Sequence, residues 1–210
     1  MKLKRAFFIS FEGIDGCGKS TQIEALKPWL SAEGLDPLFP REPGGTEIGE
    51  EIRRLLLDKK KLGMTAETEL LLFLAARAQI CRELIAPALA AGRPVICDRF
   101  LDSSLAYQGY GRGLGAEAVE QLNRFAAAEI RPDRTYLLDL PVKLAQERLN
   151  SRQMEKNRLD LESMEFMEKT RQGFLSLADR ERQRIVLLDA RRSPEEIQAQ
   201  IREDLRRFLK

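Results

Sequence analysis

The stretch from Gly13 to Ser20, GIDGCGKS, constrains the fold of this chain more than any other. It has the spacing of a phosphate-binding P-loop, G-x-x-x-x-G-K-[ST]. The apolar run 6–11 precedes it, and a helical pattern carrying Ile23 and Leu26 follows it. This is the strand–loop–helix setting in which such a loop binds phosphate, so we predict a nucleoside triphosphate site here.

Each part of the loop has a physical role in holding a triphosphate. Glycines let the backbone turn tightly so that successive N–H groups face phosphate oxygens, and the following helix adds a partial positive charge at its N-terminus. Lys19 is placed to reach the β- and γ-phosphates, and the Ser20 hydroxyl is placed to ligate Mg²⁺. The residues predicted to form this site are Gly13, Ile14, Asp15, Gly16, Cys17, Gly18, Lys19 and Ser20.

Short apolar runs alternate with longer helical patterns along the rest of the chain, which is typical of a parallel sheet covered by helices. The runs are nearly continuous in hydrophobicity, as strands buried on both faces must be. The chain has 210 residues and no linker-like tract, so we predict one α/β domain over 1–210 with a five-stranded, doubly wound parallel sheet and helices on both faces. The predicted strands are 6–11, 35–39, 94–97, 135–140 and 185–188.

Capping signals place the helices between these runs. Thr65 is predicted to cap the longest helix, which should end before Gly92, and Ser193 is predicted to open the last helix with a capping box. Closely spaced glycines in 109–115 indicate a mobile loop. The predicted helices cover about 19–33, 65–91 and 116–129, and others begin near Thr46, Pro141 and Ser193.

Composition excludes several kinds of chemistry. Histidine is absent, so neither a Ser-His-Asp triad nor a histidine metal site can form. Cys17, Cys81 and Cys97 form no C-x-x-C pair, which argues against zinc and against a disulfide framework. The formal net charge is only +2, so no nucleic-acid partner is expected. No apolar run suits a signal peptide or a membrane span, and we expect a cytoplasmic protein with no membrane partner.

Asp98 and Arg99 directly follow the apolar run 94–97. Both side chains should therefore emerge at the carboxyl edge of a central strand, where open α/β sheets bind ligands. At that edge Asp98 can orient a metal-bound water, and Arg99 can bridge donor and acceptor phosphates. The alternative is an Asp–Arg ion pair that only closes the strand end.

Other arginines are scattered along the chain, and a guanine-reading N-K-x-D segment is missing. Transfer between two phosphates must overcome charge repulsion, and guanidinium groups meet that need because they stay charged and bind phosphate bidentately. Arg148 and Arg152 are four residues apart and share one helix face, and the polar stretch 151–158 should be exposed and mobile. We predict a lid segment at about 148–160 that brings these arginines to the triphosphate. Solvation of each arginine at the surface is the alternative.

Four segments together resemble one known family. They are FEGIDGCGKST at 11–21, REPGGT at 41–46, DRF at 98–100 followed by SS at 103–104 and AYQG at 106–109, and NRLD at 157–160. In this order they resemble the bacterial thymidylate kinases over essentially the whole chain. The resemblance implies ATP-dependent conversion of dTMP to dTDP with Mg²⁺, as a step of dTTP synthesis. It also implies a homodimer, and it places the chain with the bacterial subtype whose catalytic arginines lie in the lid.

The resemblance also implies residue roles. Phe73 would stack on thymine, Arg77 would hydrogen-bond its carbonyl, and Tyr107 would crowd the sugar 2′ position. The implied catalytic residues are Lys19, Arg99, Arg152 and Arg158. The implied ATP site adds Thr21 and Arg148 to the loop residues, and the implied metal ligands are Ser20 and Asp98. The implied dTMP site consists of Asp15, Arg41, Pro43, Phe73, Arg77, Arg99, Ser104, Tyr107 and Gln108.

One departure concerns the lid motif, which in the family usually reads Asp-Arg-[Phe/Ile]-Glu and here reads Asn157-Arg158-Leu159-Asp160. An ion pair that orients Arg158 would be weakened to a hydrogen bond. The resemblance further implies a cis peptide bond between Glu42 and Pro43. Two other functions stay open: a kinase for another monophosphate such as dUMP or dCMP, and a nucleotide-binding regulator that has lost catalysis.

Overall fold

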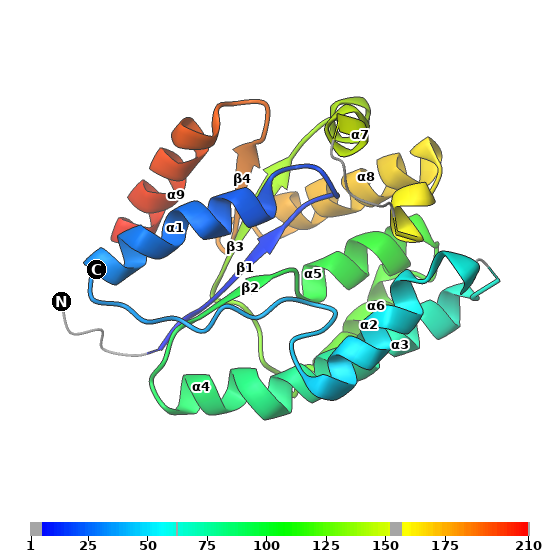
Figure 1. Ribbon diagram of the computed structural model, residues 1–210, viewed down its shortest axis with the longest axis horizontal. Helices are drawn as coiled ribbons and strands as arrows, with labels where there is room; N and C mark the ends of the chain where they lie inside the picture. Colours follow the sequence, from blue (N-terminus) through cyan, green and yellow to red (C-terminus); the bar gives the residue numbers. More distant parts are fainter. Residues whose placement is uncertain (1–5, 62, 152–156, 210) are drawn as a thin grey trace.

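A computed structural model describes residues 6–61, 63–151 and 157–209. Within these ranges the sheet has four parallel strands, β1 (Phe8–Glu12), β2 (Val95–Asp98), β3 (Arg134–Asp139) and β4 (Ile185–Asp189), in the order β2-β1-β3-β4 (Figure 1). β1 is buried along its whole length. The strands lie where the sequence predicted them, and the α/β class is confirmed.

The predicted fifth strand at 35–39 is the exception. The chain does run beside β2, but it forms only isolated parallel bridges from Leu38 to Val95 and from Arg41 to Asp98. Asp98 donates its backbone N–H to the carbonyl of Pro40 at 3.0 Å, whereas Pro40 has no N–H with which to return a bond. The ladder is therefore interrupted, and the sheet of the described residues has four strands rather than five.

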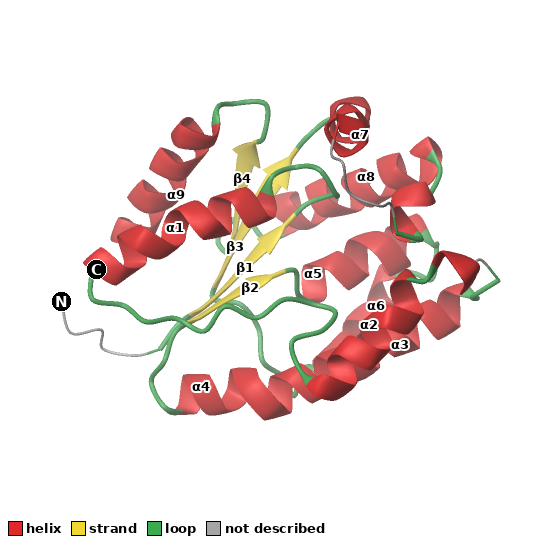
Figure 2. Ribbon diagram, viewed as in Figure 1, coloured by secondary structure: helices red, strands yellow, loops and turns green. Residues whose placement is uncertain are grey.

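Helices cover both sides of the sheet (Figure 2). In Figure 1, α1 (Lys19–Ala32) and α9 (Pro194–Phe208) lie side by side on one face, and α5 (Leu101–Ser104) and α8 (Met164–Arg180) lie on the other. The remaining helical segments are α2 (Glu47–Leu57), η1 (Lys59–Lys61), α3 (Ala66–Ile80), η2 (Cys81–Ile85), α4 (Ala86–Ala90), η3 (Leu105–Gly111), α6 (Ala116–Ala126), α7 (Val142–Ser151) and η4 (Leu159–Leu161).

The predicted caps are confirmed. The Thr65 side chain accepts a hydrogen bond from the backbone of Thr68, and α3, η2 and α4 follow it without a break over 66–90. Ser193 forms the capping box with Glu196 at the start of α9. The predicted cis bond between Glu42 and Pro43 is also present.

The prediction of a mobile loop over 109–115 is wrong for its first half, because η3 is a π-helical segment that extends to Gly111. Its glycine serves close packing: a Cβ at Gly111 would lie 2.7 Å from Thr170 Oγ1 and 2.8 Å from the Phe166 ring of α8. The α8 helix itself was not predicted, although Ser163 caps it and its apolar residues are buried. No helix in the described part of the chain is long and apolar enough to cross a bilayer.

Candidate active site

The phosphate loop connects β1 to α1 at the carboxyl edge of the sheet. Its backbone has positive φ angles of 132° at Gly13, 86° at Gly16 and 104° at Gly18. A Cβ at Gly13 would lie 2.5 Å from the carbonyl oxygen of Leu138, so both conformation and space require glycine there. The other loop residues that the sequence predicted, from Ile14 to Thr21, lie along this turn and the first turn of α1.

Lys19 folds back over the loop. Its Nζ donates to the carbonyl oxygens of Gly13 at 3.0 Å and Ile14 at 3.2 Å, and only 7% of the residue is exposed. The ammonium group is thereby held at the mouth of the loop, within reach of phosphates bound by the backbone N–H groups.

Ser20 and Asp98, the two residues predicted to be metal ligands, lie in contact beside the loop. Ser20 Oγ donates to Asp98 Oδ2 at 3.0 Å, although 78 residues separate them. A hydroxyl and a carboxylate suit Mg²⁺, which keeps several waters and takes few protein ligands. Among the described residues no group of three or more acidic, cysteine or histidine side chains could hold a metal ion.

A cavity of about 560 Å³, measured to its open mouth, lies next to the phosphate loop. It is lined by eight residues of the predicted acceptor site: Asp15, Pro43, Phe73, Arg77, Arg99, Ser104, Tyr107 and Gln108. Six further residues line it without having been predicted: Glu42, Arg53, Leu57, Ser103, Asn157 and Leu159.

Arg99 stands between the phosphate loop and this cavity. Its guanidinium donates to Gly13 O at 3.0 Å and to Asp15 Oδ1 at 2.8 Å. Its backbone has φ = 67°, a left-handed conformation that is uncommon outside glycine and concentrated at functional sites. Burial on its own would raise the pKa of Asp15, but the charges of Arg99 and Lys19 outweigh burial and hold that pKa below its usual range.

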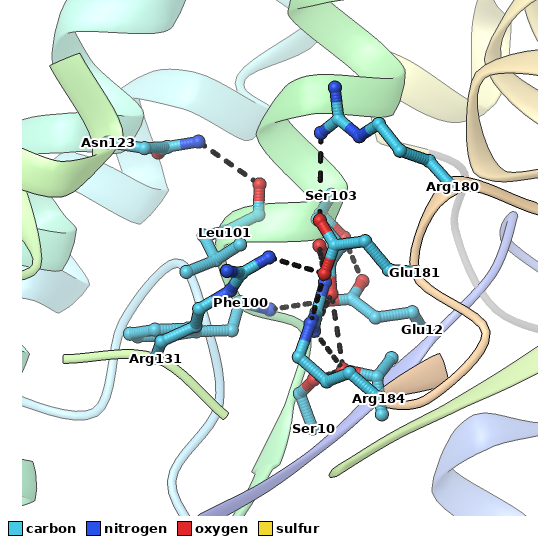
Figure 3. Close-up of polar contacts among 12 residues, drawn as sticks. Ser10, Glu12, Phe100, Leu101, Ser103, Asn123, Arg131, Arg180, Glu181 and Arg184 are labelled. Carbon is cyan, nitrogen blue, oxygen red and sulfur yellow. Dashed lines mark hydrogen bonds and ion pairs between the residues drawn. The ribbon is translucent and has the colours of Figure 1, made fainter. Parts of the chain in front are cut away.

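Glu12 braces the turn that carries Arg99. Its buried carboxylate accepts from Phe100 N at 2.7 Å and from Ser103 Oγ at 2.6 Å (Figure 3). Burial, with the nearby charge of Asp102, raises the pKa of Glu12 to about 8, against the opposing effect of these hydrogen bonds and of Arg99. No local pattern singles out Glu12, because the groups that donate to its carboxylate lie at least 88 positions later in the chain.

Arg77 lines the cavity and is buried. Its Nε donates to Glu42 Oε2 at 2.8 Å, and its Nη1 to Ser104 Oγ at 2.8 Å. It also contacts Asn123 and the Phe100 carbonyl. Glu42 Oε1 is buried and has no hydrogen-bond partner among the described residues. Burial, opposed by the charge of Arg77, raises the pKa of Glu42.

Two further arginines approach the cavity from the loop after 35–39 and from α2. Arg41, predicted for the acceptor site, does not line the cavity; it is exposed and bonds Glu50 at 3.1 Å. Arg53 does line it, and its Nη1 donates to Pro43 O at 2.8 Å. Burial, reinforced by the positive charge of Arg41, lowers the pKa of Arg53. No sequence signal marked Arg53, because it sits on a helix face rich in charged residues.

The predicted lid arginines occupy different places. Arg148 extends from α7, whose Ala145 backbone packs on Gly16, and donates to Ala190 O at 3.0 Å. Arg152 lies outside the described residues. The predicted exposure of Arg158 is wrong: only 4% of it is exposed, and it forms an ion pair of 2.6 Å with Glu69. Its catalytic role stays a prediction.

The phosphate loop lies beside a hydroxyl–carboxylate pair, and Arg99 connects the loop to the neighbouring cavity. This arrangement is that of a P-loop nucleotide-binding protein with a separate acceptor pocket. The family model "Thymidylate kinase" matches residues 11–201. The chain therefore belongs to the thymidylate kinase family.

Individual proteins agree with this membership. The thymidylate kinase of Desulfovibrio desulfuricans is 46% identical over 209 residues, covering 97% of this chain and 96% of the relative. That of Kosmotoga olearia is 48% identical over 194 residues, covering 92% of each. The crystal structure of thymidylate kinase from Ehrlichia chaffeensis superposes with a TM-score of 0.77 at 32% identity, covering 96% of this chain and 99% of that one.

Proposed function

We propose that this protein transfers the γ-phosphate of ATP to dTMP and releases dTDP, in the synthesis of dTTP. The observation that carries the proposal is the position of Arg99, which donates to Gly13 O and Asp15 Oδ1 of the phosphate loop and at the same time lines the acceptor cavity. A guanidinium at that place neutralises charge between two phosphates without needing a proton transfer.

On this proposal the phosphate loop holds the ATP tail through backbone N–H groups, and Lys19 contacts the β- and γ-phosphates. Arg99 spans the gap to the acceptor phosphate, and Arg53, which also lines the cavity, shares that phosphate. Arg41 remains a proposed contact of the same phosphate. Asp15 would orient the 3′-hydroxyl of the sugar, and the Tyr107 hydroxyl, 3.1 Å from Asp15 Oδ2, would close the space at the 2′ position.

Mg²⁺ fits the pair of Ser20 and Asp98, and when bound it would neutralise phosphate charge. The base would lie between Phe73, which is half-buried in the cavity wall, and the polar groups of Arg77, Ser104 and Gln108. Arg148 and Arg152 remain proposed contacts of ATP. A homodimer and a cytoplasmic location also remain proposals.

A panel assay tests this function. Purified protein is given ATP, Mg²⁺ and each of dTMP, dUMP, dCMP and dGMP, and diphosphate formation is followed by chromatography. We expect the highest kcat/KM with dTMP. A higher value with another monophosphate would assign a different acceptor, and no turnover with any of them would point to a regulator.

A further inference from the structure

A fully buried carboxylate, that of Glu69 on α3, lies beside the acceptor cavity and has no part in the mechanism above. Its side chain is 1% exposed. It accepts from Gln108 Nε2 at 2.9 Å, from Arg112 Nη2 at 2.9 Å and from Arg158 Nη2 at 2.6 Å. Burial would raise the pKa of Glu69, but the hydrogen bonds from these groups outweigh burial and lower it, so the carboxylate is ionised.

An ionised carboxylate can only accept hydrogen bonds, and this fixes the direction of the Gln108 amide. The NH₂ group of Gln108 must face Glu69, so the carbonyl oxygen Oε1 is the end turned away from it. Gln108 lines the acceptor cavity, and no group of residues 6–61, 63–151 and 157–209 donates to Oε1. The bond to Glu69 thus leaves the carbonyl oxygen of Gln108, a residue of the cavity lining, as an acceptor with no donor among the described residues.

The same carboxylate also holds the segment that contributes Asn157 and Leu159 to the cavity lining. Besides the ion pair with Glu69, Arg158 donates from Nε to the Leu56 carbonyl at 2.8 Å and from its backbone to the Leu57 carbonyl at 3.2 Å. Its neighbours Asn157 and Leu159 line the cavity. Asn157 Oδ1 accepts from the Leu159 N–H at 2.8 Å, so the turn that presents these two side chains is closed on itself.

The position of Glu69 along α3 explains why it can bond both Gln108 and Arg158. Glu69, Phe73 and Arg77 are spaced at four-residue intervals and therefore share one helix face. Phe73 and Arg77 line the cavity, and Glu69 lies one turn before them, where η3 and the 157–161 turn meet the helix.

We propose that Glu69 is a positioning residue for the acceptor base. It holds the Gln108 amide so that its carbonyl oxygen meets a ring N–H donor, and it holds the Asn157–Leu159 wall through Arg158. Thymine carries a donor at N3, whereas cytosine carries an acceptor there. The orientation set by Glu69 therefore favours dTMP over dCMP, an inference that rests on the function proposed above.

Glu69→Gln tests this inference. A neutral amide at position 69 can donate as well as accept, so Gln108 is free to turn over. We expect the KM for dTMP to rise about 10-fold, the ratio of kcat/KM for dTMP over dCMP to fall about 10-fold, and the KM for ATP to stay unchanged, as loss of one oriented hydrogen bond predicts.

Asp204→Asn is the matched control. Asp204 on α9 likewise holds an arginine, Arg134, and accepts from Tyr136 Oη at 2.9 Å, but it does not line the acceptor cavity. This variant should lose thermal stability without any change in the dTMP over dCMP ratio, because a merely structural ion pair does not set selectivity.

A second variant guards against misfolding. Glu69→Gln combined with Arg158→Gln removes both charges of the pair and should show the same fall in selectivity. If the single and double variants fold and keep the wild-type KM and selectivity, the inference is overturned. The proposed function would still stand in that case, provided the wild type turns over dTMP. Failure of both variants to fold would overturn it as well, since Glu69 would then be required by the fold itself. Absence of wild-type activity with dTMP would refute the proposed function instead.

Discussion

The phosphate loop and the acceptor cavity lie side by side but are held together in different ways. In the loop, Lys19 is fixed by carbonyl oxygens only five and six residues away. In the cavity, Arg77 is fixed by a carboxylate 35 residues away and Arg99 by one 84 residues away. The loop is a local structure of backbone groups, whereas the cavity is assembled by buried ion pairs between distant segments.

Substitutions in the two regions should therefore have different effects on activity and stability. A backbone cradle keeps its shape when a side chain is replaced, so substitution there removes a catalytic contact and little else. A buried ion pair leaves an uncompensated charge when one partner is removed. Substitution in the cavity should therefore change both the binding of the acceptor and the stability of the fold.

The largest effect on activity is expected for Lys19→Met. The ammonium contacts the phosphates most strongly where negative charge develops, so we expect kcat to fall about 10³-fold. Thermal unfolding should change little, because the hydrogen bonds of the lysine side chain to described residues all stay within the phosphate loop. Steady-state kinetics and calorimetry measure the two quantities. Turnover close to that of the wild type would contradict the catalytic role proposed for Lys19.

Arg99→Lys should come next. Lysine keeps the charge but cannot reach Gly13 O and Asp15 together, because it lacks the planar fork of guanidinium. We expect kcat/KM to fall about 10²-fold, with a drop in melting temperature that Lys19→Met does not show. Parallel kinetics and unfolding curves of the two variants check this. An unchanged melting temperature would contradict the role of Arg99 as a link between the two regions.

Arg53→Met should have a smaller effect, confined to the acceptor. Among the described residues, the Arg53 side chain hydrogen-bonds the Pro43 carbonyl alone, and it lines the cavity. Its loss should therefore raise the KM for dTMP about 10-fold and leave the KM for ATP and kcat nearly unchanged. Arg54→Met is the matched control, since Arg54 is exposed and pairs with Glu51 on the helix surface. Equal kinetics for the two variants would exclude Arg53 from the acceptor site.

The smallest effect on activity, with a distinct effect on stability, is expected for Glu12→Gln. The pKa of Glu12 is raised to about 8 in the fold, so the folded state keeps a proton that the unfolded state releases near pH 4.5. This bound proton adds to the free energy of unfolding, and that stabilisation is fully present below about pH 4.5 and is lost as the pH rises through about 8.

Urea unfolding from pH 5 to 9 measures this contribution. The free energy of unfolding of the wild type should fall with pH over that window, and the Gln variant should lack this component because it has no proton to lose. Glutamine can still accept from Phe100 N, so the turn should be retained. Identical pH profiles would show that Glu12 is ionised at neutral pH.

Local signals predicted most of the fold. Continuous apolar runs located β1 to β4, and the caps at Thr65 and Ser193 located the starts of two helices. The failures have long-range causes. The segment 35–39 lies beside β2 but cannot complete a hydrogen-bond ladder through Pro40. Gly111 allows α8 to pack closely and does not mark a flexible loop.

The acceptor site divides in the same way. Phe73 and Arg77 were proposed through a resemblance, and the cavity contains both. Arg53 and Glu12 were missed because a charged residue on a helix and a glutamate before a glycine carry no local pattern that separates them from solvated ones. The exposure expected for Arg158 was wrong because its partner, Glu69, lies 89 residues earlier in the chain.

The phosphate loop can be predicted from local sequence alone, because eight consecutive residues contain the glycines, the lysine and the hydroxyl that phosphate binding requires. Which charges are buried together around the acceptor depends on the packing of the whole fold. Ion pairs between segments 35 to 89 residues apart depend on how helices pack on the sheet, and no short pattern records that packing.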